Sequence, residues 1–492
     1  MSLLLRNTFW GATGGIIATV GRLVIAVILA RRFGPELFGL YVFVQWLIDT
    51  TFLVFSVGLG GVATRFFPQT FGTGSDKFPG FNRWFFRTSA LAILLASCFA
   101  ALSVLEFTHL HNLALIAAVI LLATTSSAYA LISSRAQGLF QYKRLSASSA
   151  LLVIAILSGL ALPLGRFGLF EVLVVMGAAN FLAGVFLSIS TQSSGAISRS
   201  VPLAKAHSVQ IFQFATNTWV TTFISSLVWA RGELPLVKGY LGETAVGYYS
   251  IGLTLSGMIN QGLGLLTGAL WPHIAREWDS GNRDDLLQFS CVVTNLLMVV
   301  AGLAAGFVIC FAPYILKLLF SEKFLPSSNL VLIFALGALG LTCGSAHLVL
   351  QAATNGTFAR NVSIAGGVSL FVAAFALMPR FGIEGAAVAR SVTQIGIAIL
   401  TFVRLGKVFH TSIGTSQNLR SFILLVLLAG SLMVLLRIVG PNLQIWSLCV
   451  LFGTYCGLVC LICSRGWRDG MFIEFKKLLG EGDAQTRKLA AG

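Results

Sequence analysis

The sequence predicts an all-α, polytopic membrane protein with about fourteen transmembrane helices. Fourteen apolar stretches run through its 492 residues, and each is long enough to cross the hydrocarbon core of a bilayer as a helix. Only 10% of the residues are charged, whereas about 25% are charged in a soluble protein. The apolar stretches are continuous rather than alternating, which favours helices over the strands of a barrel.

The segments between these stretches are too short to hold a folded soluble domain, and the longest cytoplasmic one covers about residues 59–83. The first stretch contains Arg22 and is not followed closely by a small-residue cleavage site, so we expect it to remain as a span. In chain order the expected spans are 8–30, 37–58, 84–105, 113–134, 145–164, 170–190, 208–230, 246–270, 287–310, 328–350, 361–379, 384–403, 421–439 and 443–463.

The distribution of Lys and Arg predicts the orientation of these spans. With a cytoplasmic N-terminus, 22 of the 33 Lys and Arg fall on the cytoplasmic side, 9 fall outside and two lie within spans. Cytoplasmic segments carry the excess of positive charge in membrane proteins. We therefore expect a multi-pass protein of the bacterial inner membrane with both termini in the cytoplasm. The net charge of +16 then needs no nucleic-acid partner.

The C-terminal tail is basic and partly amphipathic. One face of a predicted helix over 471–479 carries Met471, Phe472, Phe475, Leu478 and Leu479. Such a helix is typical of segments that lie on anionic lipid. The alternative is a disordered basic tail that only enforces the orientation.

Two halves of the chain resemble each other. Gly34 matches Gly242, Gly39 matches Gly247 and Tyr41 matches Tyr249, each at a shift of 208 residues. Arg166-Phe-Gly-Leu169 matches Arg380-Phe-Gly-Ile383 at a shift of 214. Six spans separate the halves, so we expect two lobes related by a pseudo-two-fold axis along the membrane normal. The predicted domains are a lobe at 1–200, a lobe at 201–410, two extra helices at 411–464 and a tail at 465–492.

The segment Ala30-Arg-Arg-Phe-Gly-Pro-Glu-Leu-Phe-Gly-Leu-Tyr41 resembles the polysaccharide transporter (O-antigen flippase-like) family of the multidrug/oligosaccharidyl-lipid/polysaccharide exporter superfamily. Gly242-Glu-Thr-Ala-Val-Gly-Tyr-Tyr249 and Arg380-Phe-Gly-Ile-Glu-Gly-Ala-Ala387 resemble its later signatures. The resemblance covers essentially the whole chain. It implies two six-helix lobes around a central cavity and the movement of lipid-linked sugars from the cytoplasmic to the outer leaflet.

Charged residues inside the spans are candidates for a binding site, because a charge in a bilayer is costly and usually functional. Arg22 lies within the first span, and Arg231 ends the equivalent span of the second half. A guanidinium group matches phosphate oxygens and stays charged at physiological pH. Asp49, in the second span, could neutralise Arg22 or bind a coupling proton or Na⁺. The alternatives are an Arg22–Asp49 structural pair and an Arg231 that only reaches the membrane interface.

Further candidates are Arg390 in the twelfth span and Glu233. Arg390 could line the cavity or anchor backbone carbonyls. By the family resemblance Glu233 occupies a position that often carries an acid, and the alternative is a salt bridge with Arg231 or Lys238 near the surface.

The seventh span also carries polar residues at helical spacing. They could form a hydrated face that binds sugar hydroxyls, or they could form hydrogen bonds with neighbouring helices. These residues are Gln210, Gln213, Asn217 and Thr221.

The pattern of a nucleotide-binding loop, G-x-x-x-x-G-K-[ST], does not occur in the sequence. The eight Cys lie in spans without metal-ligand spacing. We therefore expect a non-enzymatic transporter without a cofactor, although coupling to H⁺ or Na⁺ stays open.

The first hypothesis for function is a flippase for an undecaprenyl-pyrophosphate-linked oligosaccharide or polysaccharide precursor, working by alternating access. The expected partners are the lipid-linked glycan, membrane lipids and polysaccharide-assembly proteins. Alternatives are a cation-coupled multidrug exporter or a peptidoglycan-precursor flippase of the same superfamily. A membrane glycan polymerase or ligase and a secretion-complex scaffold are alternatives of a different class.

Overall fold

The structure is a computed structural model that describes residues 3–71, 77–108, 112–162, 168–190, 205–268, 283–354, 356–409, 413–439 and 444–464, with a few single residues between 268 and 283. Within these ranges the secondary structure is helical and contains no strand. The predicted all-α fold of a polytopic membrane protein is therefore confirmed. The helix predicted over 471–479 lies outside the described residues.

Each expected span coincides with helical structure. The helices of the first part of the chain are α1 (Leu3–Phe55), α2 (Leu59–Phe71), α3 (Lys77–Thr108), α4 (Leu113–Gly138), α5 (Tyr142–Ala161), α6 (Leu169–Ser190), α7 (Lys205–Ser226), the π-helical turn η1 (Leu227–Arg231) and α8 (Leu234–Gly268). Those of the second part are α10 (Arg283–Leu319), the 3₁₀ turn η2 (Glu322–Ser327), α11 (Ser328–Ala338), the 3₁₀ turn η3 (Leu339–Cys343), α12 (Gly344–Ala353), α13 (Thr357–Phe409), α14 (Ile413–Val439) and α15 (Ile445–Ser464).

Ten helical segments of the described chain are long and apolar enough to cross a membrane. Two of them, within α1 and α13, each contain two expected spans joined across a glycine. The α7 and α8 helices are not among the ten, because polar side chains interrupt their apolar surface.

The chain forms two compact units, and the division falls inside α8. The first unit runs from Leu3 to Gly247 and the second begins at Tyr248. The first unit thus includes α7 and the beginning of α8. The lobes expected at 1–200 and 201–410 follow the sequence repeat and stay a prediction.

Two glycines reverse the chain at equivalent positions of the repeat. Gly34, within α1, has φ 71° and ψ −178°. Gly242, within α8, has φ 81° and ψ −177°. This backbone conformation is essentially restricted to glycine, because a Cβ would clash with the chain. The sequence match at a shift of 208 therefore corresponds to a shared backbone geometry.

Inside the first unit the segments after these two glycines pack against each other reciprocally. A Cβ atom on Gly39 would collide with the carbonyl oxygen of Glu243, and a Cβ atom on Gly247 would collide with the carbonyl oxygen of Pro35. Residues 35 and 243, like residues 39 and 247, are related by the shift of 208. The two copies of the motif thus contact each other through the same atoms in both directions.

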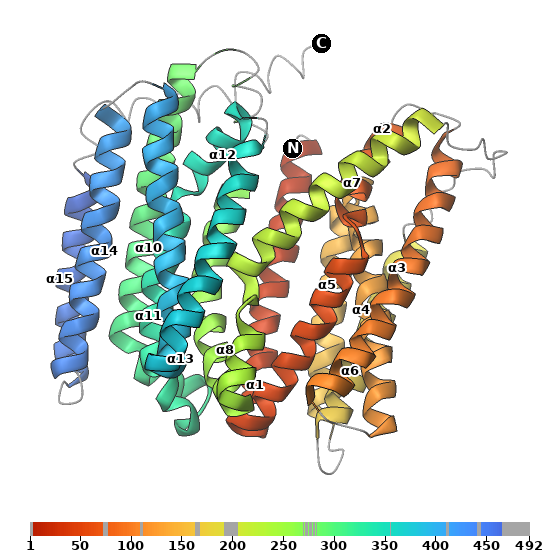
Figure 1. Cartoon of the computed structure of the whole chain (residues 1–492), viewed down its shortest axis with the longest axis horizontal. Coiled ribbons are helices and arrows are strands. Elements are labelled where there is room, and N and C mark those ends of the chain that lie inside the picture. Colours follow the sequence, from red (N-terminus) through yellow and green to blue (C-terminus); the bar gives the residue numbers. More distant parts are fainter. Residues whose placement is uncertain are drawn as a thin grey trace. The chain divides into compact units, whose positions relative to one another are not determined.

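The core at one end of the first unit is aromatic. The α2 helix falls in the segment expected to be the longest cytoplasmic connection, and it buries Leu59, Val62, Ala63, Phe66 and Phe67 along one face. This face packs on α3 and α4. Figure 1 shows α3, α4 and α6 as neighbouring helices of this unit.

Arg65 of α2 joins this core to α7. Its guanidinium carbon lies 4.3 Å from the centroid of the Phe214 ring, and Phe214 packs edge-on against Phe66. Cation–π contacts of this kind stabilise a structure by about 0.5–1 kcal/mol at exposed sites. The interaction contributes to holding α7 on the first unit.

In the second unit the two extra C-terminal helices pack on α10 (Figure 1). Gly302 of α10 faces Leu425 of α14 and Val459 of α15, and Gly306 faces the ring of Tyr455. Small residues allow membrane helices to approach closely. Elsewhere in the unit, the Ser391 hydroxyl donates to the Ile333 carbonyl at 2.8 Å and connects α13 to α11.

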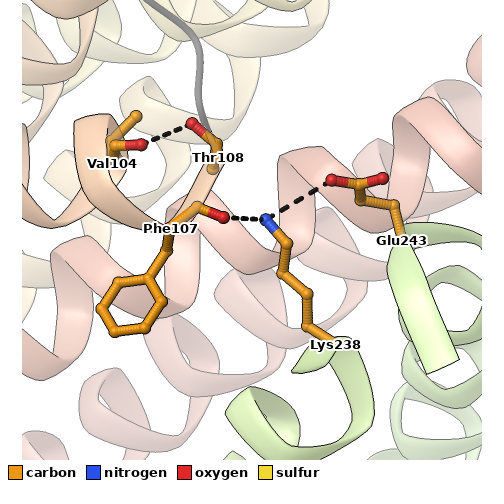
Figure 2. A network of polar contacts seen from close by, with 5 residues as sticks. All are labelled: Val104, Phe107, Thr108, Lys238 and Glu243. Carbon is orange, nitrogen blue, oxygen red and sulfur yellow. Dashed lines mark hydrogen bonds and ion pairs between the residues drawn. The ribbon is translucent and has the colours of Figure 1, made fainter. Parts of the chain in front are cut away.

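Lys238, near the start of α8, connects this helix to the end of α3 by a hydrogen bond. Its ammonium group donates to the Phe107 carbonyl at 2.8 Å and forms an ion pair with Glu243 at 3.4 Å (Figure 2). The nitrogen also lies 4.3 Å from the centroid of the Phe43 ring. The last carbonyls of a helix lack partners in the helix itself, and a cation there is favourable. Burial lowers the pKa of Lys238, and the Glu243 carboxylate opposes this effect.

We predict that Gly39→Ala and Gly247→Ala each destabilise the protein by about 1–3 kcal/mol, because the added methyl group must push the opposing backbone away. The melting temperature of the detergent-solubilised protein measures the effect. Gly239→Ala is the matched control, since no atom lies within 4 Å of its would-be Cβ. Equal melting temperatures for all three variants would contradict the reciprocal contact.

We also predict that Lys238→Met lowers stability by about 1–3 kcal/mol, because methionine keeps the apolar stem but loses a charged hydrogen bond. Lys317→Met provides the comparison. Lys317 pairs with Glu322 at an exposed position, where ion pairs contribute little. The prediction is wrong if both variants unfold at the same temperature as the parent protein.

Candidate substrate-binding site

The part of α1 that follows Gly34, called here its second limb, runs antiparallel to the helix α7 in the first unit. The Trp219 indole N–H donates to the Leu53 carbonyl at 3.0 Å, and Gly58 lies against the Ala215 carbonyl. Arg231 is twelve residues beyond Trp219, and Tyr41 is twelve residues before Leu53. This register brings Arg231 to the level of Tyr41, which precedes the predicted acid Asp49 by eight residues, or about 12 Å along the helix.

Asp49 is the centre of a small charged cluster in this unit. The Gln45 amide, one helical turn away, donates to a carboxylate oxygen of Asp49 at 3.0 Å. The positive charges of Arg231 and Arg22 both act on the Asp49 carboxylate, and that of Arg231 also acts on Tyr41. Arg22, Asp49 and Arg231 are thus electrostatically coupled within one compact unit.

The packing of α1 on α5 places Arg22. Gly21 is buried against Val153 of α5, and Ile25 is also buried. Arg22 follows Gly21 by one residue and is exposed, because successive residues of a helix point about 100° apart. The guanidinium therefore lies off the helix face that packs on α5.

An irregular turn places Arg231. The five residues Leu227–Arg231 form the π-helical turn η1, and such turns are rare and frequently found at functional sites. Gly232 follows directly, and a Cβ there would collide with the backbone of Leu227. Glu233 is completely buried. The helix is therefore interrupted where the two predicted charges stand.

The predicted polar face of α7 is partly available. Gln213 and Asn217 are exposed, and Thr221 is half-buried. The Thr221 hydroxyl donates to the carbonyl of Asn217 in its own helix at 3.0 Å. Gln210 lies in α7, but its side chain is outside the described part of the chain. Two amide groups of the predicted face thus remain accessible on the first unit.

Arg390 lies in the second unit, within the second limb of α13. Its side chain is only 3% exposed. The neighbouring residue Ser391 and the nearby Gln394 pack tightly against Gly337 of α11. The surroundings of Arg390 are those of a buried residue at a helix–helix contact within its own unit.

The sequence had not singled out Gln45 or Tyr41. Gln45 precedes Asp49 by four residues, which is the spacing at which side chains of one helix meet. Tyr41 was noted only as part of the repeat, and its hydroxyl donates to the sulfur of Met176 at 3.3 Å. The spacing of Gln45 and Asp49 was a usable signal, whereas the level of Tyr41 depends on the register between α1 and α7.

Chemically, the cluster offers two guanidinium groups, one carboxylate and neighbouring amides within membrane-spanning helices. Guanidinium groups bind phosphate oxygens in a bidentate manner. Among the described residues no group of three or more His, Cys, Asp and Glu could hold a metal ion.

Several known structures share this fold. The chain is similar to an inward-facing multidrug resistance MATE family transporter of the MOP superfamily, at a TM-score of 0.63 and 13% identity, covering 82% of this chain and 99% of that one. It is similar to the lipid II flippase MurJ in an inward closed conformation, at a TM-score of 0.63 and 14% identity, covering 93% and 99%. A mutant of the Vibrio cholerae MATE transporter VcmN follows at 0.57 and 14%, covering 84% and 98%.

No curated protein matches the chain. The family described as polysaccharide biosynthesis protein matches residues 4–278, which is more than half of the 492 residues. This match, with the fold of the MATE and MurJ transporters, confirms the resemblance found in the sequence motifs. The chain belongs to the polysaccharide biosynthesis protein family.

Proposed function

We propose that this protein is a flippase that moves a lipid-linked oligosaccharide or polysaccharide precursor, carried on undecaprenyl pyrophosphate, across the bacterial inner membrane. The observation that carries the proposal is the placement of two guanidinium groups in one compact unit, that of Arg22 inside the apolar helix α1 and that of Arg231 at the π-helical turn after α7. Charges in that environment are retained mainly for function. The pyrophosphate of a lipid carrier is an anion that two guanidinium groups can bind.

The cargo also needs polar contacts for its sugars. The exposed amides of Gln213 and Asn217 on α7 suit sugar hydroxyls as donors and acceptors. Arg22 and Arg231 hold the phosphates, while the polar face of α7 meets the glycan. Glycan-assembly proteins of the same membrane are the expected partners, and the transport cycle alternates access between the two sides.

A multidrug exporter is the second candidate, because the fold is similar to that of a multidrug resistance transporter. A cationic drug requires an excess of buried acid. The guanidinium groups of Arg22 and Arg231 supply the planar donors that an anionic phosphate cargo requires, which favours that cargo.

We predict that Arg22→Ala and Arg231→Ala each reduce transport roughly ten- to hundredfold, because each removes a charged hydrogen bond of about 1.5–3 kcal/mol to the phosphates. Arg22→Lys should keep part of the activity, since it retains the charge without the planar fork. The measurement is the surface polysaccharide of a deletion strain of the source bacterium that expresses each variant, together with the accumulated lipid-linked precursor.

Arg83→Ala is the control for this series, because Arg83 is exposed on α3. Immunoblots show that each variant reaches the membrane in equal amount. Wild-type surface polysaccharide in Arg22→Ala and Arg231→Ala cells would contradict the proposed role of the arginines.

The proposed orientation, with both termini in the cytoplasm, is tested by alkaline phosphatase fusions, which are active only outside the inner membrane. A fusion after Thr108 should be active and a fusion after Phe140 inactive, because α4 returns the chain to the cytoplasmic side. The reverse pattern would invert the orientation derived from the Lys and Arg distribution.

A further inference from the structure

The helices α2 and α7 meet along a close seam, at the end of the first unit that is expected to face the cytoplasm. Gly58, just before α2, lies against the Ala215 carbonyl, and Gly61 lies against the side chain of Thr218. Arg65 follows Gly61 by four residues, so it lies on the same face of α2 one turn further along. Arg65 therefore stands where α2 meets α7.

An aromatic ring positions the guanidinium of Arg65. The guanidinium carbon lies 4.3 Å from the centroid of the Phe214 ring, and Phe66 packs edge-on against that ring. The Arg65 side chain is nevertheless exposed. A guanidinium above an aromatic ring still has N–H donors at its edge, and the contact limits its movement. Arg65 thus offers oriented donors to an anion outside the seam.

Two exposed amides border this guanidinium on α7. Gln213 and Asn217 are both exposed and are one helical turn apart. At about 100° per residue, Asn217 lies about 60° and Gln213 about 100° from Phe214 in one direction around the helix. Thr218, which packs on α2, lies about 40° in the other direction. The amides therefore face outward beside Arg65 and not into the contact with α2.

The position of these amides along α7 decides which phosphate they can serve. Gln213 precedes Arg231 by eighteen residues, or about 27 Å along the helix, which is the length of several sugar rings. Phe214, the ring beneath Arg65, is the next residue. In a lipid-linked glycan the first sugar is bonded directly to the pyrophosphate. Only a phosphate held at Arg65 places that first sugar beside Gln213 and Asn217.

We propose that Arg65 forms a loading site, where the pyrophosphate of the lipid-linked glycan binds on the expected cytoplasmic side before it reaches Arg22 and Arg231. The amides of Gln213 and Asn217 then bind the first sugar. Arg65 contacts the substrate, whereas the Phe214 ring acts through the guanidinium and positions it. This inference rests on the proposed function and adds a second, separate phosphate site to it.

The test uses the purified full-length protein in detergent and measures the dissociation constant of undecaprenyl pyrophosphate by native mass spectrometry. In the Arg22→Ala/Arg231→Ala double variant the probe should still bind, because Arg65 remains. Adding Arg65→Gln should weaken this binding about tenfold or more, since charged hydrogen bonds are lost. Lys143→Gln in the same background is the matched control. Lys143 is also an exposed cation near an aromatic ring, that of Trp10, and its loss should leave the dissociation constant unchanged.

Two substitutions of Phe214 in the double variant test the positioning role. Phe214→Leu keeps an apolar side chain without the ring and should weaken binding about threefold or more. Phe214→Tyr restores an aromatic ring and should restore the dissociation constant. If Phe214→Leu lowers only the melting temperature and leaves the dissociation constant unchanged, the ring does not position Arg65.

The role of the two amides is tested with the lipid-linked precursor extracted from the deletion strain. Gln213→Ala/Asn217→Ala should weaken binding of this glycan-bearing lipid about tenfold, because hydrogen bonds to the sugar are lost. The same change should leave the affinity for undecaprenyl pyrophosphate, which carries no sugar, unchanged. Equal affinities of the parent protein and this variant for the extracted precursor would contradict the sugar contact.

Failure of the loading site can be distinguished from failure of the proposed function. If the Arg22→Ala/Arg231→Ala variant binds no undecaprenyl pyrophosphate, the loading site is wrong while the proposed function stands. The same holds if Arg65→Gln weakens binding of dioleoylphosphatidylglycerol equally, because Arg65 is then a general phospholipid site. A parent protein that binds no undecaprenyl pyrophosphate overturns both. If the variant with Arg65→Gln does not fold, judged by its melting temperature, Arg65→Lys decides, since it should weaken binding in part.

Discussion

The positions of the charged residues depend on a contact between two backbone reversals. Gly39 and Gly247 let two copies of one motif approach until each meets the carbonyl of the other. The reversals at Gly34 and Gly242 set the point from which the limbs of α1 and the adjoining part of α8 rise. Distances along these helices then determine which side chains meet. A displacement at the reversals would change the level of Arg22, Asp49 and Arg231 together.

The bilayer makes the positions of these charged residues important. A bilayer supplies no water to compensate a charge or a backbone group, so each arginine in a span must find its compensation inside the protein or in a ligand. In the first unit, Asp49 supplies part of that compensation for both Arg22 and Arg231. Away from the cluster, Arg65 lies on the ring of Phe214 and Lys238 on that of Phe43. Both of these cations lie outside the expected spans, and Lys238 also pairs with the Glu243 carboxylate.

The spans, the fold class and the glycine reversals could be predicted from the sequence because they follow from local properties. The length of an apolar stretch defines a span. The glycines that recur at positions 34 and 242 indicate that both copies of the motif require the same backbone conformation. The helix α2 was expected only as a connection, because its apolar face is short and its packing depends on α3 and α4. The level of Arg231 relative to Tyr41 depends on the register set by Trp219 and Leu53, and no spacing in the sequence encodes that register. Glu233 was a candidate from the family pattern, but its complete burial depends on the tertiary fold.

The π-helical turn over Leu227–Arg231 has a consequence for how this part of the chain can evolve. A π turn holds one residue more than an α turn, so it behaves as a one-residue insertion inside a helix. The wider turn absorbs this extra residue, so the helix before it and the chain after it keep nearly the same relative orientation. Deleting one residue here would therefore remove the bulge and restore ordinary α geometry with little rotation of the flanking segments. A related protein with a one-residue gap at this place can thus keep the direction of its guanidinium group, whereas the same gap in a regular helix would turn that group by about 100°.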